Sequence, residues 1–212
     1  MNNILKISTC ALAGLLIACN PEKKEVETTA PTTEISQLEK EHLLEMVGYA
    51  ESVNLGLVDD TIKGSARREA KGSIGGTEVT INYGSPGKRG RTIWNGLVAY
   101  DQVWVSGSHW ATAVTFSKDV VIDGTEVKAG TYAFFTIPGV SEWTVILNKN
   151  FDQHLADEYD EVEDLVRIIV QPKELDHEVQ RLTYEVEKTS DADGVISLSW
   201  DQIKVSMPFS IK

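Results

Sequence analysis

The first residues that are suited to binding a ligand lie in a short cationic segment, GSPGKRGR, which covers residues 84–91. Arg89 and Arg91 each carry a planar guanidinium that can hold a carboxylate or sulfate through two parallel hydrogen bonds. The segment is not a nucleotide phosphate loop, because two residues separate its first two glycines and Lys88 is followed by arginine. Two interpretations remain: an anion-binding loop, or a flexible solvated turn whose cations pair with nearby acids.

A second segment, SGSHWAT, places His109 beside Trp110 in a stretch of small residues. An exposed indole on a β scaffold can stack on a sugar ring or an apolar ligand, whereas a buried one belongs to the core, and both alternatives are open for Trp110. Trp104 and Trp143 lie among alternating apolar residues, which favours burial. Together with Glu142, the two segments give the candidate ligand-binding residues: Arg89, Arg91, His109, Trp110 and Glu142.

Hydrolysis is the alternative chemistry at the same aromatic loop. Ser108 places a hydroxyl next to the His109 imidazole, but adjacent side chains on a strand point to opposite faces, which weakens a nucleophile and base pair. The 32 acidic residues make a pair of carboxylates easy to find and uninformative. The sequence therefore assigns no catalytic residue.

The sequence predicts no metal and no cofactor in the folded part of the chain. Residues 152–164 hold seven carboxylates and His154, but a calcium loop needs a glycine that this stretch lacks. An acidic loop is therefore favoured over a hard-cation site. The 20 Lys and Arg against 32 Asp and Glu give a net charge of −12, which argues against nucleic acid as a partner, because phosphate binding needs a cationic face.

The amino-terminal sequence predicts where in the cell the protein is located. Residues 1–18 combine one basic residue, Lys6, with an apolar run too short to span a bilayer, as in a secretory signal peptide. The run ends in Leu-Ile-Ala-Cys, which resembles the bacterial lipobox, where cleavage precedes a cysteine that receives a diacylglycerol. The alternative is an ordinary signal peptide with a coincidental cysteine. We expect Cys19 to be lipidated, the membrane to be a partner through this anchor, and the protein to lie at the bacterial cell envelope, on the outer membrane.

Between the anchor and the body, the sequence predicts a tether and then a helix. Residues 19–34 are rich in polar residues and proline, which is typical of a flexible tether. Residues 35–65 are expected to hold a helix and a linker. The helix is predicted over residues 37–53, because Ser36 and Glu39 form a capping-box pattern before apolar residues at helical spacing.

The elements that carry the two candidate segments are predicted to be strands. From Gly64 onward the apolar residues alternate with polar ones, and Asp-Gly pairs at 123–124 and 193–194 indicate hairpin turns. Residues 66–212 are therefore expected to form a mainly β domain, an antiparallel β-sandwich or a jelly-roll-like barrel, preceded by one N-terminal helix. Pro208 cannot donate a ladder hydrogen bond, so the last strand is expected at an edge. The expected strands are 78–83, 112–116, 120–122, 125–127, 131–137, 143–147, 166–170, 182–186, 196–200 and 203–211.

A series of short motifs extends through this β region: Ser-Pro and Gly-Arg within 84–91, Gly-Leu-Val at 96–98, Val-Trp at 103–104, Ala-Gly-Thr-Tyr at 129–132, Ile-Pro-Gly at 137–139 and Glu-Trp-Thr at 142–144. Together they resemble a bacterial family called domain of unknown function 2911. The resemblance covers residues 67–211 and is looser from Tyr159-Asp160 onward. The resemblance implies a secreted or lipid-anchored envelope protein and implies no activity. The chain departs from the family pattern at Val105, where a basic residue is usual, and at His109 and Trp110, where an asparagine and an acid are usual.

These features predict an envelope lipoprotein that acts as a ligand-binding or interaction module. The alternative is a hydrolase that acts at the aromatic loop. The ligand class stays open among small molecules, glycans and proteins.

Overall fold

The computed structural model describes residues 48–212. The predicted signal peptide, Cys19, the tether and most of the predicted helix lie outside the described residues. The end of that helix is described as α2 (Tyr49–Asn54), which stops one residue beyond the predicted end. Within residues 48–212, no helix is long and apolar enough to cross a membrane.

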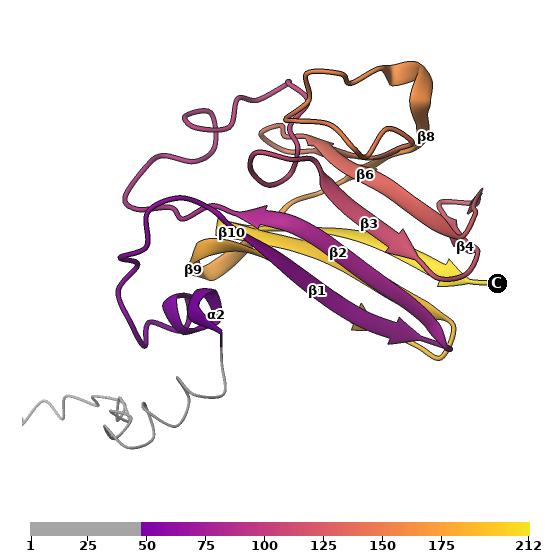
Figure 1. Ribbon diagram of the computed structural model, residues 1–212, viewed down its shortest axis with the longest axis horizontal. Helices are drawn as coiled ribbons and strands as arrows, with labels where there is room; N and C mark the ends of the chain where they lie inside the picture. Colours follow the sequence, from indigo (N-terminus) through magenta and orange to yellow (C-terminus); the bar gives the residue numbers. More distant parts are fainter. Residues whose placement is uncertain (1–47) are drawn as a thin grey trace, which may run out of the picture. The chain divides into compact units, whose positions relative to one another are not determined.

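The described strands form two antiparallel sheets (Figure 1). The six-stranded sheet has the order β1 (Ala66–Ile74), β2 (Thr77–Ser85), β3 (Thr112–Phe116), β6 (Gly130–Ile137), β7 (Trp143–Asn148) and β8 (Asp164–Val170). The four-stranded sheet has the order β5 (Thr125–Val127), β4 (Val120–Ile122), β10 (Asp193–Ile211) and β9 (Lys173–Lys188). A short 3-10 helix, η1 (Glu161–Glu163), precedes β8.

Local chemistry explains the strands that were easiest to predict. The strands β3, β4 and β5 have the predicted bounds. The turn between β4 and β5 holds Asp123 at φ 47° and Gly124 at φ 77°. Positive φ at both central residues is the geometry of a tight hairpin turn, which Asp-Gly adopts at low cost. By contrast, β1 is missing from the prediction, because its residues alternate between exposed and half-buried and carry few apolar side chains.

The strand β10 merges two predicted strands, 196–200 and 203–211, into one bent element. The bend falls at Asp201, whose φ is 55°. The hydroxyls of Ser197 and Ser206 lie 2.9 Å apart, so the two halves of β10 lie side by side beyond the bend. This places apolar residues from both halves in the same core.

The predicted edge position of the last strand is wrong, because β10 lies between β4 and β9 in the sheet. The pairing with β9 ends at Lys204, and the pairing with β4 begins at Ser210. Pro208 has no partner in either of these two ladders.

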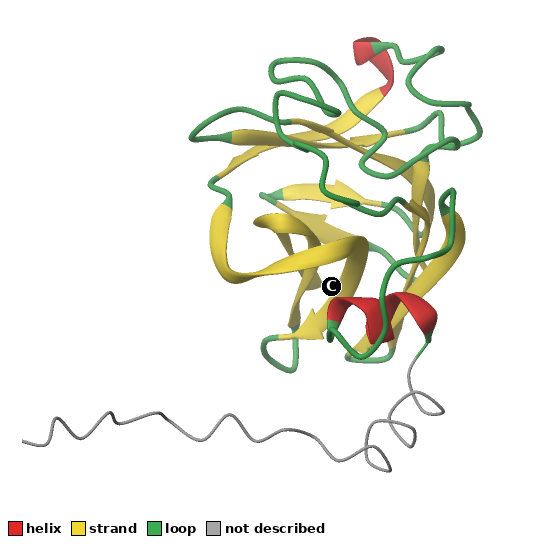
Figure 2. Ribbon diagram, turned by 90° about the vertical axis from the view of Figure 1, so that its left-hand side faces the viewer, coloured by secondary structure: helices red, strands yellow, loops and turns green. Residues whose placement is uncertain are grey.

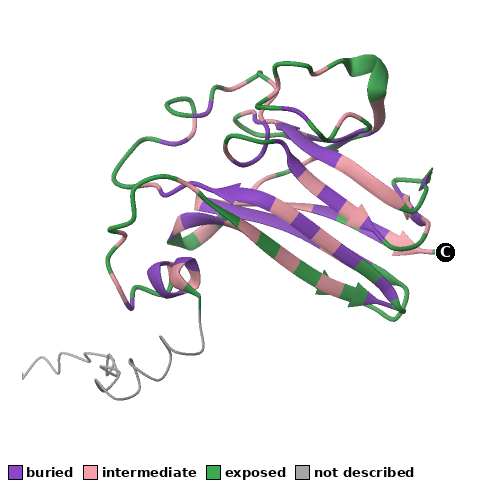
Figure 3. Cartoon of the chain, in the orientation of Figure 1, coloured by how far each residue is buried: buried purple, intermediate pink, exposed green. Residues whose placement is uncertain are grey.

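The main core lies between the two sheets. It joins Ile81 and Phe134 of the six-stranded sheet to Leu198 and Met207 of β10, each at most 1% exposed. Figure 3 shows the resulting alternation of buried and less buried positions along the long strands. The two sheets keep separate edges and do not close on each other, so the two-sheet prediction is confirmed and the barrel alternative is wrong.

A smaller core lies on the other side of the six-stranded sheet, where long loops cover it (Figure 2). Val105 and Ala111 of one loop pack there with Phe135 and Ile146 of the sheet. This packing fixes the loop that carries His109 and Trp110, and so positions one of the two candidate segments.

Candidate functional site

The cationic loop that follows β2 is tied to β9 by its backbone. The amide of Lys88 donates to the carbonyl of Gln180 at 2.6 Å, and the amide of Leu182 donates to the carbonyl of Pro86 at 3.0 Å. The predicted flexible turn is therefore a hydrogen-bonded part of the scaffold, which can present its side chains in a fixed arrangement.

Lys88 supports the interpretation that the cations of this loop pair with nearby acids. Its Nζ donates to Glu178 Oε1 at 2.5 Å and to Asp201 Oδ1 at 2.7 Å. Burial alone lowers the pKa of the ammonium, but the hydrogen bonds to the two carboxylates outweigh it, and the pKa of Lys88 is raised. This charge is already matched inside the protein.

A buried ion pair holds the segment before β1 against the body of the domain. Arg181 of β9 is 1% exposed, and its Nε and Nη2 donate to Asp60 Oδ1 at 3.0 and 2.6 Å. The same guanidinium donates to the carbonyls of Ser85 and Ile62 at 3.1 and 2.7 Å. Arg89 approaches the other carboxylate oxygen of Asp60, with 3.6 Å between Nε and Oδ2. We call this group, Asp60 with Arg89 and Arg181, the Asp60 clasp.

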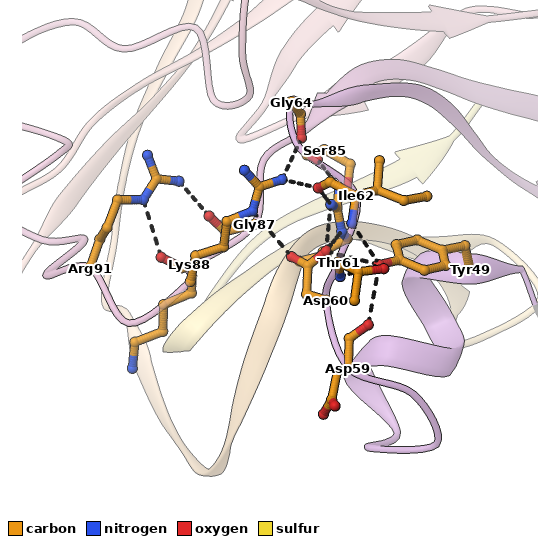
Figure 4. Close-up of polar contacts among 12 residues, drawn as sticks. Tyr49, Asp59, Asp60, Thr61, Ile62, Gly64, Ser85, Gly87, Lys88 and Arg91 are labelled. Atoms are coloured by element: carbon orange, nitrogen blue, oxygen red, sulfur yellow. Dashed lines mark hydrogen bonds and ion pairs between the residues drawn. The ribbon is translucent and has the colours of Figure 1, made fainter.

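Tyr49 of α2 completes the surroundings of the clasp (Figure 4). Its hydroxyl accepts hydrogen bonds from the amides of Thr61 and Ile62 at 2.8 and 3.1 Å, and it donates to Asp60 Oδ1 at 3.1 Å. The guanidinium of Arg181 lies 5.3 Å from the centre of the tyrosine ring, within cation–π range. Residues far apart in sequence are thus held together by one shared carboxylate.

Arg91 differs from the other cations of the loop. Its Nε donates to the carbonyl of Lys88 at 3.1 Å, and its Nη2 donates to the carbonyl of Gly87 (Figure 4). Within residues 48–212, no carboxylate pairs with Arg91 and its Nη1 has no hydrogen-bond partner. The guanidinium is oriented by backbone contacts while its charge stays unmatched.

Beside the cationic loop lies a cavity of about 410 Å³, which we call the Arg–Trp cavity. Trp104 and Trp200 line it and stack on each other, with ring centroids 6.0 Å apart and an interplanar angle of 21°. Trp94 packs edge-on against both rings, and Trp143 packs edge-on against Trp94. Trp143 is buried as predicted, and Trp104 is half-buried. The lining residues are Gly64, Ser65, Pro86, Gly87, Arg89, Arg91, Leu97, Val98, Trp104, Val105, Gly107, Ser108, His109, Leu155 and Trp200.

A second cavity of about 340 Å³, the Trp110 cavity, shares Ser65, Ser108 and His109 with the first. Trp110 lines it and is 52% exposed, with its ring 5.8 Å from that of His154 in an edge-on arrangement. Trp110 is therefore an exposed indole, which is one of the two predicted alternatives.

The five candidate residues divide between these places. Arg89 and Arg91 line the Arg–Trp cavity, Trp110 lines the Trp110 cavity, and His109 lines both. Glu142 lines neither and is exposed just before β7. Four of the candidates are thus gathered at two adjoining cavities, and one is not.

The acidic segment 152–164 forms a loop that ends in η1. Asp164 accepts hydrogen bonds from Tyr159 and Arg167, both at 2.7 Å. Burial, followed by the hydrogen bond to Asp164, raises the pKa of the Tyr159 hydroxyl. No group of three or more His, Cys, Asp or Glu within the described residues is arranged to hold a metal ion.

Comparison with known protein families assigns the β domain to a family. A family model described as "Protein of unknown function (DUF2911)" matches residues 65–209. The chain belongs to the DUF2911 family. No curated protein and no solved structure matches it.

The match covers the lining of both cavities except Gly64, and the Asp60 clasp spans its amino-terminal boundary. Tyr49 and Asp60 precede residue 65, whereas Arg89 and Arg181 lie within the match. Periodicity does not single out Arg181, because an arginine in an alternating strand usually faces solvent, and its acidic partner lies 121 residues away. One feature does distinguish Arg181: it lies directly between Val179-Gln180 and Leu182, in a part of β9 that is otherwise mostly buried.

The exposure of Trp110 gives a testable difference among the tryptophans of this DUF2911 domain. We expect a neutral quencher such as acrylamide to reach Trp110, which is 52% exposed, but not Trp143 or Trp200, which are 2% and 1% exposed. Stern–Volmer titration of Trp110→Phe should show loss of most of the quenchable emission, whereas Trp143→Phe should retain it. Unchanged quenching in Trp110→Phe would mean that this indole is covered.

Proposed function

We propose that the protein is a lipid-anchored binding module of the bacterial envelope, and that it takes a small ligand into the Arg–Trp cavity. The observation that carries this proposal is that two residues lining the cavity each have a buried polar atom without a hydrogen-bond partner. Trp200 is 1% exposed, yet its Nε1 has no hydrogen-bond partner within residues 48–212, and the same holds for the buried Ser108 Oγ. A buried donor without a partner costs about 1–3 kcal/mol, which a bound ligand can recover.

The shape and composition of the cavity support the same proposal. Its volume of about 410 Å³ lies in the range of small-molecule sites, which is roughly 300–1,000 Å³. Trp104, Trp200 and Val98 supply apolar lining, and Arg89 and Arg91 supply polar groups. An apolar pocket with a few convergent polar groups is the typical form of a ligand site.

The amino-terminal pattern supports the envelope location. Removal of residues 1–18 would take away Lys6 and no acid, so the net charge would change from −12 to −13. An acidic body of this kind is repelled by anionic headgroups, so attachment would depend on the acyl chains at Cys19. Each buried methylene contributes about 0.8 kcal/mol, and stable anchoring takes more than one chain.

The hydrolase alternative gains no support from the geometry. His109 has a φ of 65°, and within the described residues its imidazole makes no hydrogen bond to Ser108 or to a carboxylate. A nucleophile needs a base within hydrogen-bond reach, and that base needs an orienting group. We therefore propose a binding module and not a hydrolase.

A thermal-shift screen tests the proposed function. We expect some compounds from a panel of small carboxylates, sugars, peptides and lipids to raise the melting temperature of the full chain, because a ligand at 100 times its Kd stabilises the native state by about 2.7 kcal/mol. Leu97→Trp should abolish these shifts. Leu97 lines the cavity and is 50% exposed, so the larger ring can enter the cavity at little cost to the fold.

Leu55→Trp is the matched control, because Leu55 is 62% exposed and lines neither cavity. It should keep every shift that the unmodified protein shows. A panel without a single shift, or shifts that survive Leu97→Trp, would overturn the proposed function.

A further inference from the structure

We infer that the ligand of the Arg–Trp cavity is an organic anion, a carboxylate joined to a flat apolar body, which Arg91 holds through its guanidinium. This inference rests on the proposed function and specifies its ligand class. It follows from three features of the cavity: the sign of the charges in its wall, the donor character of its free polar atoms, and its paired indoles.

The charges in the cavity wall are of one sign. The protein as a whole has a net charge of −12, yet none of the residues that line this cavity is acidic. The ionisable side chains that line it are Arg89, Arg91 and His109. In a protein so rich in carboxylates, a wall without one favours an anionic ligand over a cationic one.

The neighbouring acids do not neutralise this wall. Asp60 is shared between Arg181 and Arg89, so one carboxylate faces two guanidiniums. Lys88, next to Arg89 in sequence, is matched by two carboxylates of its own. Arg91 has none among the described residues, and it is exposed, so an incoming carboxylate can reach it.

The unpartnered polar atoms of the lining residues suit a ligand that accepts hydrogen bonds. Arg91 Nη1 and Trp200 Nε1 can only donate hydrogen bonds, and the Ser108 hydroxyl can do so as well. Arg89 Nη1 also lacks a hydrogen-bond partner within residues 48–212. A carboxylate offers acceptors only and fits a guanidinium with two parallel hydrogen bonds.

The rest of the wall selects a flat apolar body. Trp104 is half-buried, stacks on the buried Trp200 and presents aromatic surface, and Leu97 and Val98 add aliphatic surface to the lining. Trp104 is held in place because its Nε1 donates to the carbonyl of Gly107 at 3.2 Å. Offset or edge-on contacts with these rings favour an aromatic or other planar ligand.

Calorimetry with two nearly isosteric probes, 2-naphthylacetate and 2-naphthylacetamide, tests the inference on the purified full-length protein. The acid should bind at least tenfold more tightly than the amide, because a charge-assisted hydrogen bond is roughly twice as strong as a neutral one. Arg91→Gln should remove this preference and leave the affinity for the amide nearly unchanged.

Lys88→Gln is the matched control. It removes one positive charge from the same loop, but Lys88 does not line the cavity and its ammonium is bound to Glu178 and Asp201. The preference for the acid should persist in this variant. An equal loss in Lys88→Gln and Arg91→Gln would overturn the direct role of Arg91, and thermal unfolding of each variant shows whether it folds.

The comparison of acid and amide on the unmodified protein needs no variant to fold. Equal binding of the two probes, or no binding of either, would overturn the anion preference. The proposed function would survive that result if other compounds still produced shifts that Leu97→Trp abolishes. A panel without cavity binders would overturn both.

Discussion

Replacing Arg181 with methionine is expected to destabilise the folded protein by about 3 kcal/mol, because it leaves a buried carboxylate without its main partner. The Asp60 side chain is 9% exposed and accepts two hydrogen bonds from this guanidinium. The change also removes a donor from the carbonyls of Ser85 and Ile62. Breaking such a pair typically costs about 3–5 kcal/mol, and we expect the lower end because Arg89 stays within 3.6 Å of Asp60.

The measurement is thermal or denaturant unfolding of the full chain. A loss of about 3 kcal/mol corresponds to a fall in Tm of roughly 6–12 °C for a domain of this size. The double variant Arg181→Met with Asp60→Leu should recover much of the loss, because it removes both charges and fills the space with apolar atoms.

An exposed ion pair supplies the control for this experiment. Lys71 and Glu69 lie 2.7 Å apart with side chains 61% and 45% exposed, so Lys71→Met should change the stability by less than about 1 kcal/mol. If Arg181→Met cost no more than this control, the Asp60 clasp would be an ordinary solvated pair.

The fold was predictable from the sequence where local chemistry decides it. Apolar alternation and an Asp-Gly turn define β4 and β5 to the residue. The strand β1 could not be found in this way, because its charged residues, such as Arg67 and Lys71, give no apolar face. Pairing with β2 along all nine residues makes it a strand, and that pairing is not a local property.

The sequence predicted which residue types form the candidate site, but not which side chains pair with one another. Arg89 and Arg91 are visible as a cationic run, but the sequence does not say which of them is already matched. Asp60 precedes Arg89 by 29 positions, and Arg181 follows Arg89 by 92. Only the folded backbone therefore brings the three residues of the clasp together. Trp200 likewise lies far from the other tryptophans in sequence and stacks on Trp104 in the structure.

Glu142 is the candidate residue that the structure separates from the other four. It precedes Trp143 in the Glu-Trp-Thr motif at residues 142–144. Trp143 is 2% exposed and packs against Trp94 in the core, whereas Glu142 faces solvent before β7. Neighbours in sequence point to opposite sides at a strand, so the burial of one indole carries the adjacent carboxylate away from the cavity.

Replacing Cys19 with alanine is expected to release the protein from membranes completely. The sulfur of Cys19 is the proposed attachment point, and within residues 48–212 no helix could span a bilayer. Two or more acyl chains hold a protein stably, since each buried methylene contributes about 0.8 kcal/mol. Without them, the acidic body has no attraction to anionic lipids that would keep it at the surface.

Fractionation of cells that express the full chain measures this release, together with incorporation of labelled palmitate. Cys10→Ala is the matched control, because it makes the same change inside the predicted signal peptide and should leave both membrane attachment and labelling intact. Retention of Cys19→Ala in the membrane fraction after a high-salt wash would contradict the anchor. A salt wash is decisive because it removes proteins held by surface charge, whereas acyl chains in the bilayer resist it.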